Sequence, residues 1–482
     1  MTRLIVGPFN RVEGDLQVKL DVEDGRVREA FVTATMYRGF EQILPGRAPS
    51  DALTIVPRIC GICSLSQSVA AARALAALGG LQPPPNGTHA VNLMSAVENL
   101  ADHLVHFYLF FMPDFAREAY AARPWHGEAL RRFAAGQGEH ARKAIAARQR
   151  WFTIMGTLGG RWPMSGSVVP GGSARALETS ERIRLLSLLH EFRAFLEDTL
   201  FGAPLEAVTA LHDEAALLAW ADATPQSDFA LFVTLARDLQ LAALGPGPGR
   251  FLSYGAYPQP DGGFTFAQGL WEAGRLSPLD IASIGEDAAH AWLADGGRPL
   301  HPSEGVTEPL ADKPGAYTWN KAPRLGGRVV ETGAIARQLA AGQPLVTALV
   351  QATGGNVLTR VVARVLELAT VVPMMEAWLK ALQPREPFVN PGELPDDGDA
   401  AGLAEAARGA LGHWVSVRGG RIARWQIVAP TSWNFSPRDA QGTPGALETA
   451  LVGTPVEVDA AMPVAVQHVV RSFDPCMVCT VH

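Results

Sequence analysis

The chain has 482 residues, of which 48% are hydrophobic and 18% charged, and its formal net charge at pH 7 is −7. This composition is typical of a globular protein with a large core, and the lack of a basic excess argues against nucleic acid as a partner. No apolar run reaches the length of about 18 residues that a membrane-spanning helix needs, and the N-terminus lacks the apolar segment of a signal peptide. We therefore expect a cytoplasmic protein with no membrane span.

The first predicted element is a β-hairpin near the N-terminus. Hydrophobic and polar residues alternate over 16–22, Asp24-Gly25 supplies the turn, and 27–34 runs back. The alanines and leucines of 64–78 then predict a helix, which Gly79-Gly80 ends.

Helical periodicity dominates the middle of the chain. Apolar residues at i, i+3 and i+4 spacing predict a helix over 88–111, and similar patterns predict helices at 128–152, 173–200, 203–221, 227–243, 331–341 and 355–383. Between them, the glycine- and proline-rich segment 245–265 predicts irregular structure. The proline-rich, acidic segment 384–400 predicts an exposed loop.

β structure returns towards the C-terminus. Two short hydrophobic runs, 414–417 and 422–428, flank Gly419-Gly420, which is the signal of a tight hairpin. No period of about 20–50 residues repeats, so a solenoid is excluded. The sequence therefore predicts a single domain over 1–482, mainly α with small β elements near both termini, an α+β arrangement around a large helical body.

Four cysteines form two Cys-x-x-Cys pairs near opposite ends of the chain: Cys60 with Cys63, and Cys476 with Cys479. Four are too few for a disulfide scaffold, so the pairing indicates metal binding or redox chemistry. Thiolates select zinc, iron–sulfur, copper(I) or nickel, and spacing alone leaves structural zinc and a redox disulfide open. A protein of this size has core enough to fold without a metal clamp, so a site that joins both ends points to function.

The residues around the two pairs make the interpretation specific. Arg58-Ile59-Cys60-Gly61-Ile62-Cys63 and Asp474-Pro475-Cys476-x-x-Cys479-x-x-His482 resemble the two signature motifs of [NiFe]-hydrogenase large subunits. Further similar blocks follow in order: Arg11-Val12-Glu13-Gly14, Arg38-Gly39-Phe40-Glu41, His106-Phe107-Tyr108 with Asp114, Tyr317-x-Trp319-x-Lys321-Ala322-Pro323-Arg324, Glu405-x-x-Arg408-Gly409, and Pro430-Thr431-Ser432-Trp433-Asn434. The resemblance extends from residue 7 to the last residue.

The resemblance implies a Ni–Fe centre whose iron carries cyanide and carbon monoxide, Fe(CN)2(CO). Cys60 and Cys476 would be terminal nickel ligands, whereas Cys63 and Cys479 would bridge nickel to iron. Glu13 would accept a proton from Cys479 when H2 is split, a role that suits a buried carboxylate with a raised pKa.

The same resemblance implies a positive group over the metal pair. Arg408 would overhang its open side, held by Asp114 and Asp474, and an arginine there stays charged. Thr431 would donate a hydrogen bond to a cyanide ligand.

A magnesium ion is also implied. Glu41, the terminal His482 and the carbonyl of Ile427 would hold Mg²⁺, because hard oxygen ligands suit this ion. For His482 and Glu41 a bridge through water is the alternative.

Some positions beside the cofactor depart from the family pattern. Gln67 stands where the family commonly has histidine, Ala407 replaces the proline expected before Arg408, and Met164 replaces another histidine. These changes put rate and proton routes in doubt, but not metal assembly.

Two further positions favour one branch of the family. Ile62 and Phe110 stand where ordinary enzymes commonly have valine and leucine at the mouth of the gas channel, and this pair resembles the regulatory, H2-sensing hydrogenases. We expect the larger side chains to exclude O2 while passing H2; neutral variation in the core is the alternative. Sensing members also lack the C-terminal extension of standard large subunits, which agrees with an end at His482.

Partners follow from the same resemblance. All four cysteines are taken by the metal pair, so no iron–sulfur cluster is expected in this chain and electrons would pass to an iron–sulfur small subunit. A sensor would act on a histidine kinase, in a higher oligomer of heterodimers. The alternatives are an energy-conserving uptake hydrogenase, a zinc-clamped scaffold, and the quinone-binding subunit of respiratory complex I, a lineage that has lost the four cysteines.

Overall fold

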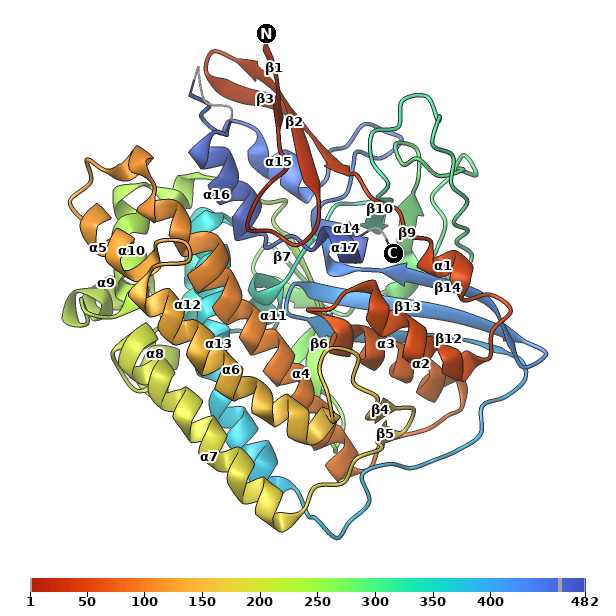
Figure 1. Cartoon of the computed structure of the whole chain (residues 1–482). Helices are drawn as coiled ribbons and strands as arrows, with labels where there is room; N and C mark the ends of the chain where they lie inside the picture. The colour runs from red at the N-terminus through yellow and green to blue at the C-terminus, as the bar shows by residue number, and fades with distance from the viewer. Residues whose placement is uncertain (1, 458–461, 481) are drawn as a thin grey trace.

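The structure is a computed structural model that describes residues 2–457, 462–480 and 482. Helices hold 45% of the chain and strands 20%, which confirms the mainly helical fold. The long helices form a body on one side, and the sheets gather on the other side and above it (Figure 1).

The N-terminal sheet is antiparallel with the strand order β1-β2-β3. Its strands are Thr2–Val6, Leu16–Glu23 and Arg26–Ala34. Leu16, Val18 and Leu20 alternate with polar residues and are buried, because successive strand residues point to opposite faces. The predicted first hairpin is confirmed.

The helical body is built around α4 (Pro85–Val105), which packs against α3, α6 and α13. These three are Ser64–Leu78, Glu139–Gly159 and Val357–Ala381. A π-helical segment, His106–Phe111, extends α4. Other helices are α5 (His126–Phe133), α7 (Thr179–Phe195), α8 (Leu205–Thr209), α9 (Glu214–Ala223), α10 (Asp228–Asp238), α11 (Ala334–Ala340), α12 (Pro344–Thr353), α15 (Ala446–Leu451) and α16 (Val464–Ser472).

Two of the predicted helices are each divided. The predicted helix over 128–152 is α5 followed by α6, because Gly136 has a positive φ of 71° and turns the chain between them. The predicted helix over 203–221 is likewise α8 followed by α9.

The prediction of irregular structure over 245–265 is wrong. β6 (Arg250–Pro258) and β7 (Phe264–Glu272) form a hairpin there, within a sheet of order β11-β6-β7-β8. The glycines and prolines cluster at 245–249, before β6, and in the turn at 259–263. β11 is Glu331–Thr332 and β8 is Arg275–Ser277. Strands therefore also lie in the middle of the chain.

A third sheet has the strand order β12-β13-β14, and Arg408 lies in the turn between its first two strands. Its strands are Gly398–Ala406, Gly409–Arg418 and Arg421–Val428. The hairpin at Gly419-Gly420 is confirmed, but β12 begins inside the segment predicted as an exposed loop. The sheet packs against α3, and α14 (Pro430–Asn434) follows its last strand and contacts α17 (Met477–Thr480).

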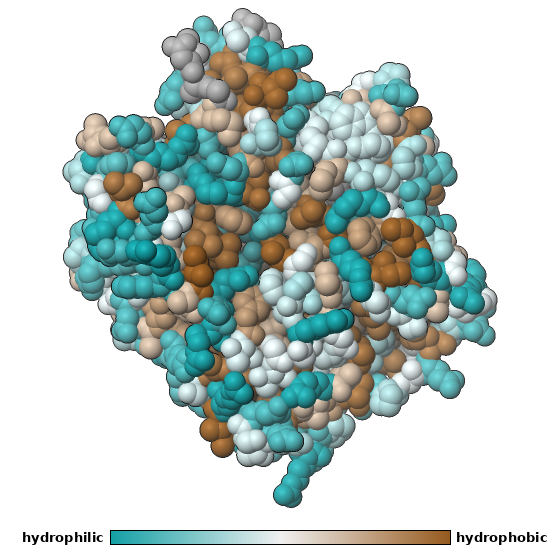
Figure 2. Space-filling view, in the orientation of Figure 1, coloured by the Kyte–Doolittle hydropathy of each residue, from teal (hydrophilic) through white to brown (hydrophobic). Residues whose placement is uncertain are grey.

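The remaining elements are short. They are α1 (Phe40–Ile43), α2 (Ala52–Ile55), β4 (Val168–Val169), β5 (Gly172–Ser173), β9 (Ile284–Asp287) and β10 (Ala322–Leu325). Within residues 2–457, 462–480 and 482, no helix is both long and apolar enough to cross a membrane. Figure 2 shows hydrophilic residues interspersed with smaller hydrophobic areas on one face.

Candidate metal centre

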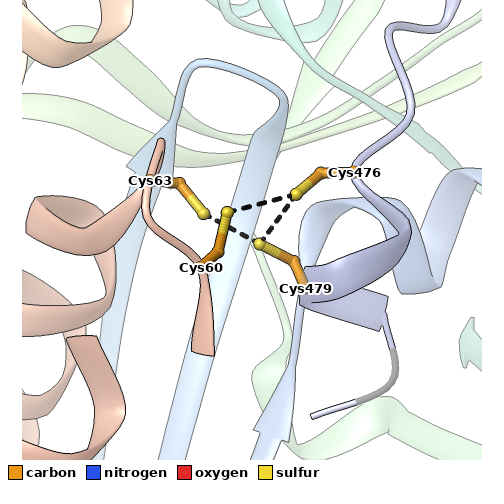
Figure 3. Close-up of side chains that lie close together, drawn as sticks. All are labelled: Cys60, Cys63, Cys476 and Cys479. Atoms are coloured by element: carbon orange, nitrogen blue, oxygen red, sulfur yellow. Dashed lines mark hydrogen bonds between the residues drawn. The ribbon is translucent and has the colours of Figure 1, made fainter. Parts of the chain in front are cut away.

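The four cysteines meet at one buried point, although they come from opposite ends of the chain. The distance between the Cys63 and Cys479 sulfurs is 2.8 Å, that between Cys60 and Cys476 is 3.5 Å, and that between Cys476 and Cys479 is 3.1 Å. All four sulfurs lie within 4.8 Å of one another. Figure 3 shows them pointing towards a common centre, from the N-terminus of α3 and from α17.

Backbone contacts hold the two pairs together. The Glu13 carbonyl accepts a hydrogen bond of 2.7 Å from the Met477 amide, and the Glu13 amide donates to Pro475 at 3.3 Å. Arg38 donates to the Ile59 carbonyl at 2.5 Å and also to the Val478 carbonyl. One guanidinium therefore ties the segment before Cys60 to the segment before Cys479, a role that the motif alone did not reveal.

The donor set fits a soft, positively charged metal group. Hydrogen bonds among the thiols, together with burial, raise the pKa of Cys63 and of Cys479 well above the usual range, and burial raises the pKa of Cys476. Four thiolates this close repel one another unless a cation lies between them. Buried sulfur donors favour zinc, nickel and iron over magnesium or calcium.

Arg408 lies beside this cluster, fixed by two carboxylates. Its Nη1 is 2.5 Å from Asp102, and its Nη2 is 3.0 Å from the carboxylate of Asp474, whose carbonyl also accepts from Nε at 2.9 Å. The guanidinium is buried, and the charges of Asp102 and Asp474 outweigh that burial and raise the Arg408 pKa well above its usual range. The predicted contact with Asp474 is therefore confirmed.

The prediction that Asp114 holds Arg408 is wrong. Asp114 instead accepts from Arg471 at 2.5 Å and from Arg11. The reason is its place in the chain, because it follows the π-helical segment, which packs against α16, the helix that carries Arg471. Asp102 takes the expected role from α4.

A sequence signal for Asp102 did exist. Asn99, His103 and His106 share one polar face of the predicted helix, and Asp102 falls at helical spacing on that same face. A carboxylate on a buried helix face needs a cationic partner. This requirement makes Asp102 a candidate partner for a buried arginine such as Arg408.

Glu13 lies near the four cysteines, and neighbouring charges affect the pKa of its carboxyl group. Its side chain is half-buried, and burial raises its pKa, as does the charge of Cys60, whereas Arg408 opposes the rise. Within the described part of the chain, no hydrogen bond joins its carboxylate to Cys479. The proton-accepting role stays a prediction.

Three further predicted residues each have a defined hydrogen-bond partner. The Thr431 hydroxyl accepts from the Cys476 amide at 3.1 Å, at the start of α14. The Ala407 carbonyl accepts from Arg337 at 3.0 Å. The Gln67 amide oxygen lies 2.7 Å from the ring of the buried His413, so the two side chains hold each other in place.

The residues predicted to hold magnesium are adjacent, but their contacts differ from those expected. His482 Nε2 lies 3.2 Å from Glu41, and Ile427 contacts Glu41 through its amide at 2.7 Å. The Lys321 ammonium lies 3.5 Å from Glu41 and 3.4 Å from Glu286. Burial alone would raise the Glu41 pKa, but Lys321 and His482 outweigh it and hold it at about 2.

The Lys321 ammonium already supplies one positive charge beside the carboxylates of Glu41 and Glu286. Lys321 also donates to Gln426 at 2.8 Å, and neither it nor Glu286 was assigned a role from the sequence. The Ile427 carbonyl as a magnesium ligand stays a prediction.

Ile62 and Phe110 are both half-buried. Ile62 packs against the main core beside Cys63, and the Phe110 carbonyl accepts from Arg11 at 3.2 Å. Their effect on gas access stays a prediction.

The comparisons with known proteins agree over the whole chain. The family model described as nickel-dependent hydrogenase matches residues 38–130 and 137–482. The chain is 31% identical to the periplasmic [NiFeSe] hydrogenase large subunit of Desulfomicrobium baculatum, covering all of this chain and 95% of that protein. It is 29% identical to the hydrogenase-2 large chain of Escherichia coli K12, covering 97% of it.

A solved structure, that of the Ni-Fe-Se hydrogenase from D. vulgaris Hildenborough in the reduced state, superposes with a TM-score of 0.85 at 29% identity, over all of both chains. The fold, the four-thiol cluster and these matches lead to the same conclusion. The chain belongs to the nickel-dependent hydrogenase family and is the large subunit of a [NiFe]-hydrogenase.

Proposed function

We propose that this subunit holds the Ni–Fe centre at which H2 is cleaved heterolytically, and that it belongs to a regulatory, H2-sensing hydrogenase. The observation that carries the first part is the meeting of four buried thiols from both ends of the chain beside a fixed arginine. Sulfur donors of this kind hold nickel and iron.

Each thiol has its own place in the proposal. Cys60 and Cys476 would bind nickel alone, Cys63 and Cys479 would be shared with the iron of an Fe(CN)2(CO) unit, and Thr431 would donate a hydrogen bond to a cyanide. When bound, the metal group polarises H2 and takes up its electron pair. The remaining steps belong to the side chains of the protein.

Cys479 receives the proton from H2, and Glu13 takes it from the Cys479 sulfur. A carboxyl group whose pKa burial raises is suited to pass a proton at neutral pH. Arg408, which Asp102 and Asp474 orient, would present to the bound centre a charge that does not titrate. It stabilises negative charge there without competing for the proton.

Metal analysis and infrared spectroscopy test this reading on the complex made with its maturation partners. We expect one nickel per large subunit, iron in excess of nickel because the small subunit adds iron–sulfur clusters, and infrared bands of metal-bound carbon monoxide and cyanide. Zinc in the purified complex, with those bands missing, would overturn the proposal in favour of a structural clamp.

A substitution tests the proton route separately. Glu13→Gln keeps the side-chain shape but cannot accept a proton, so we expect the infrared bands to persist while H2 oxidation falls by about 100-fold or more. Full activity in Glu13→Gln would show that the proton leaves elsewhere.

The sensing assignment is supported by Ile62 and Phe110. Added volume next to Cys63 narrows gas access and excludes O2 more than H2. The names of the relatives, hydrogenase-2 and uptake hydrogenase, favour the alternative of an energy-conserving enzyme.

Oxygen exposure separates the two readings. We expect Ile62→Val with Phe110→Leu to make H2 oxidation oxygen-sensitive, whereas Ile55→Val, a half-buried core change on the same segment, leaves tolerance intact. Activity of the double variant that is unchanged in air would count against the gas-filter role.

The partners follow from this reading. The proposal includes an iron–sulfur small subunit, a histidine kinase as the target, a higher oligomer of heterodimers, a cytoplasmic location, and Mg²⁺ at Glu41, His482 and Ile427. Slow turnover with H2-dependent control of the kinase is the expected behaviour. Fast, quinone-linked H2 oxidation would assign the chain to the uptake type instead.

A further inference from the structure

A cavity lies away from the thiols, between α3, the first turns of α4, the β4–β5 hairpin and the turn of the β6–β7 hairpin. Its volume is about 310 Å³, within the range of small-molecule sites. Arg73, which lines it, is ten residues along α3 from Cys63, a rise of about 15 Å. The cavity is therefore separate from the metal centre.

The walls of this cavity are mainly apolar. They include Val69 and Ala72 of α3, Val91 of α4, Val168, Pro258 and Phe264. The polar lining residues Gln82, Thr88, Asn92 and Gln259 are uncharged. Among the described residues that line the cavity, Arg73 is the one that carries a charge.

The charge of Arg73 is not balanced by a carboxylate among the described residues. Its Nη1 donates to the Leu403 carbonyl at 2.7 Å, and within residues 2–457, 462–480 and 482 no carboxylate pairs with it. Burial lowers the pKa of Arg73 to about 10, so it is still charged at neutral pH. Arg73 is half-buried; the fully buried Arg337, by contrast, pairs with both Glu367 and Glu405.

A half-buried guanidinium that lacks a carboxylate partner and lines a mainly apolar cavity can accept a counter-charge from a ligand. A guanidinium presents a planar fork of donors that matches carboxylate, sulfonate and phosphate groups. The apolar walls suit a hydrocarbon or aromatic body attached to such a group.

We propose that this cavity binds a small amphipathic organic anion, whose acidic group Arg73 holds while its apolar body packs against the walls. The site goes beyond H2 cleavage and does not depend on it. Charge complementarity with Arg73 and the size of the cavity favour this occupant over an uncharged lipid or a peptide.

Fluorescence titration of the assembled, metal-loaded complex with anilinonaphthalene sulfonate tests the proposal. We expect one saturable site per large subunit and at least about tenfold weaker binding in Arg73→Gln, the effect of losing one charge-assisted contact. The uncharged analogue phenylnaphthylamine should bind both proteins equally. Arg148→Gln, which changes a half-buried arginine stacked on Phe152 outside the cavity, is the matched control and should leave binding intact.

A second variant keeps the proposal falsifiable if Arg73→Gln fails to assemble. Ala76→Phe adds bulk from a lining position of α3, so it should weaken binding of both the charged and the uncharged probe. Equal binding of the sulfonate by wild type, Arg73→Gln and Ala76→Phe would overturn the proposal. Saturable binding by the isolated large subunit but none by the complex would also overturn it, since a partner would then cover the cavity.

Discussion

Two clusters of arginine and aspartate, built from the same residue types, lie in different parts of the molecule. Beside the thiols, one arginine, Arg408, is shared by Asp102 and Asp474. At the packing of α16 against the π-helical segment, one aspartate, Asp114, is shared by Arg11 and Arg471.

The ratio of arginine to aspartate differs between the two clusters, and each ratio suits the surroundings of its cluster. Two carboxylates fix the orientation of Arg408 and leave its charge near Cys63 and Cys476. Asp114 is a hub between distant segments, with no thiol among its contacts in the described residues. An arginine–carboxylate cluster is therefore informative about chemistry only when its surroundings are included.

The largest expected effect is on stability at Asp114. Asp114→Asn removes the carboxylate and leaves two buried or half-buried guanidinium groups unpaired, which should lower the free energy of unfolding by about 3–5 kcal/mol. Asp102→Asn is the matched change, and it should cost less because Arg408 keeps Asp474. Denaturant unfolding of both variants measures the difference; an equal loss would contradict the distinction between the clusters.

Arg408→Lys should show the reverse pattern. Lysine keeps the charge but cannot contact two carboxylates through a planar fork, so H2 oxidation should fall by about 100-fold, the size of effect typical for one positioned electrostatic group. Metal content and unfolding should stay near wild type. Arg471→Lys serves as the control with the opposite outcome expected, a loss of stability and normal activity per loaded protein.

The smallest expected effect is on the free energy of unfolding at acidic pH. Burial tends to raise the pKa of Asp114, but Arg471, His468 and Arg11 outweigh it and hold that pKa below its ordinary value. A depressed carboxylate pKa stabilises the fold above the unfolded pKa of about 3.9 and loses that contribution as pH falls through the folded pKa. The stability gap between wild type and Asp114→Asn should therefore narrow below about pH 4; a constant gap from pH 7 to pH 3 would be inconsistent with this ion pair.

Features with local signals were predictable from the sequence. The hairpin turns at Asp24-Gly25 and Gly419-Gly420, the helix over 64–78 and the meeting of the two cysteine pairs all follow from turn chemistry, periodicity or thiol chemistry. Glycine and proline in 245–265 hid the β6–β7 hairpin, because their clusters at 245–249 and 259–263 flank β6 and dominate the composition of the segment.

Pairings between distant residues were not predictable in the same way. Asp102 and Asp114 lie on either side of a π-helical segment, and the rotation of the chain there decides which of them reaches Arg408. The ammonium of Lys321 beside Glu41 likewise depends on how β10 and α1 approach in space. Motifs identify which residues matter, whereas tertiary packing decides which partner each one has.

The sequence separation of the thiols has a consequence for biosynthesis. Cys60 lies 416 positions before Cys476, and Cys63 lies equally far before Cys479. At about 5–20 residues per second, a ribosome needs roughly 20–80 s to make that stretch. During this time the first pair is exposed to any free metal ion in the cell without its partner thiols. Loading of the complete site can begin only after translation has passed Cys479, when all four thiols are available.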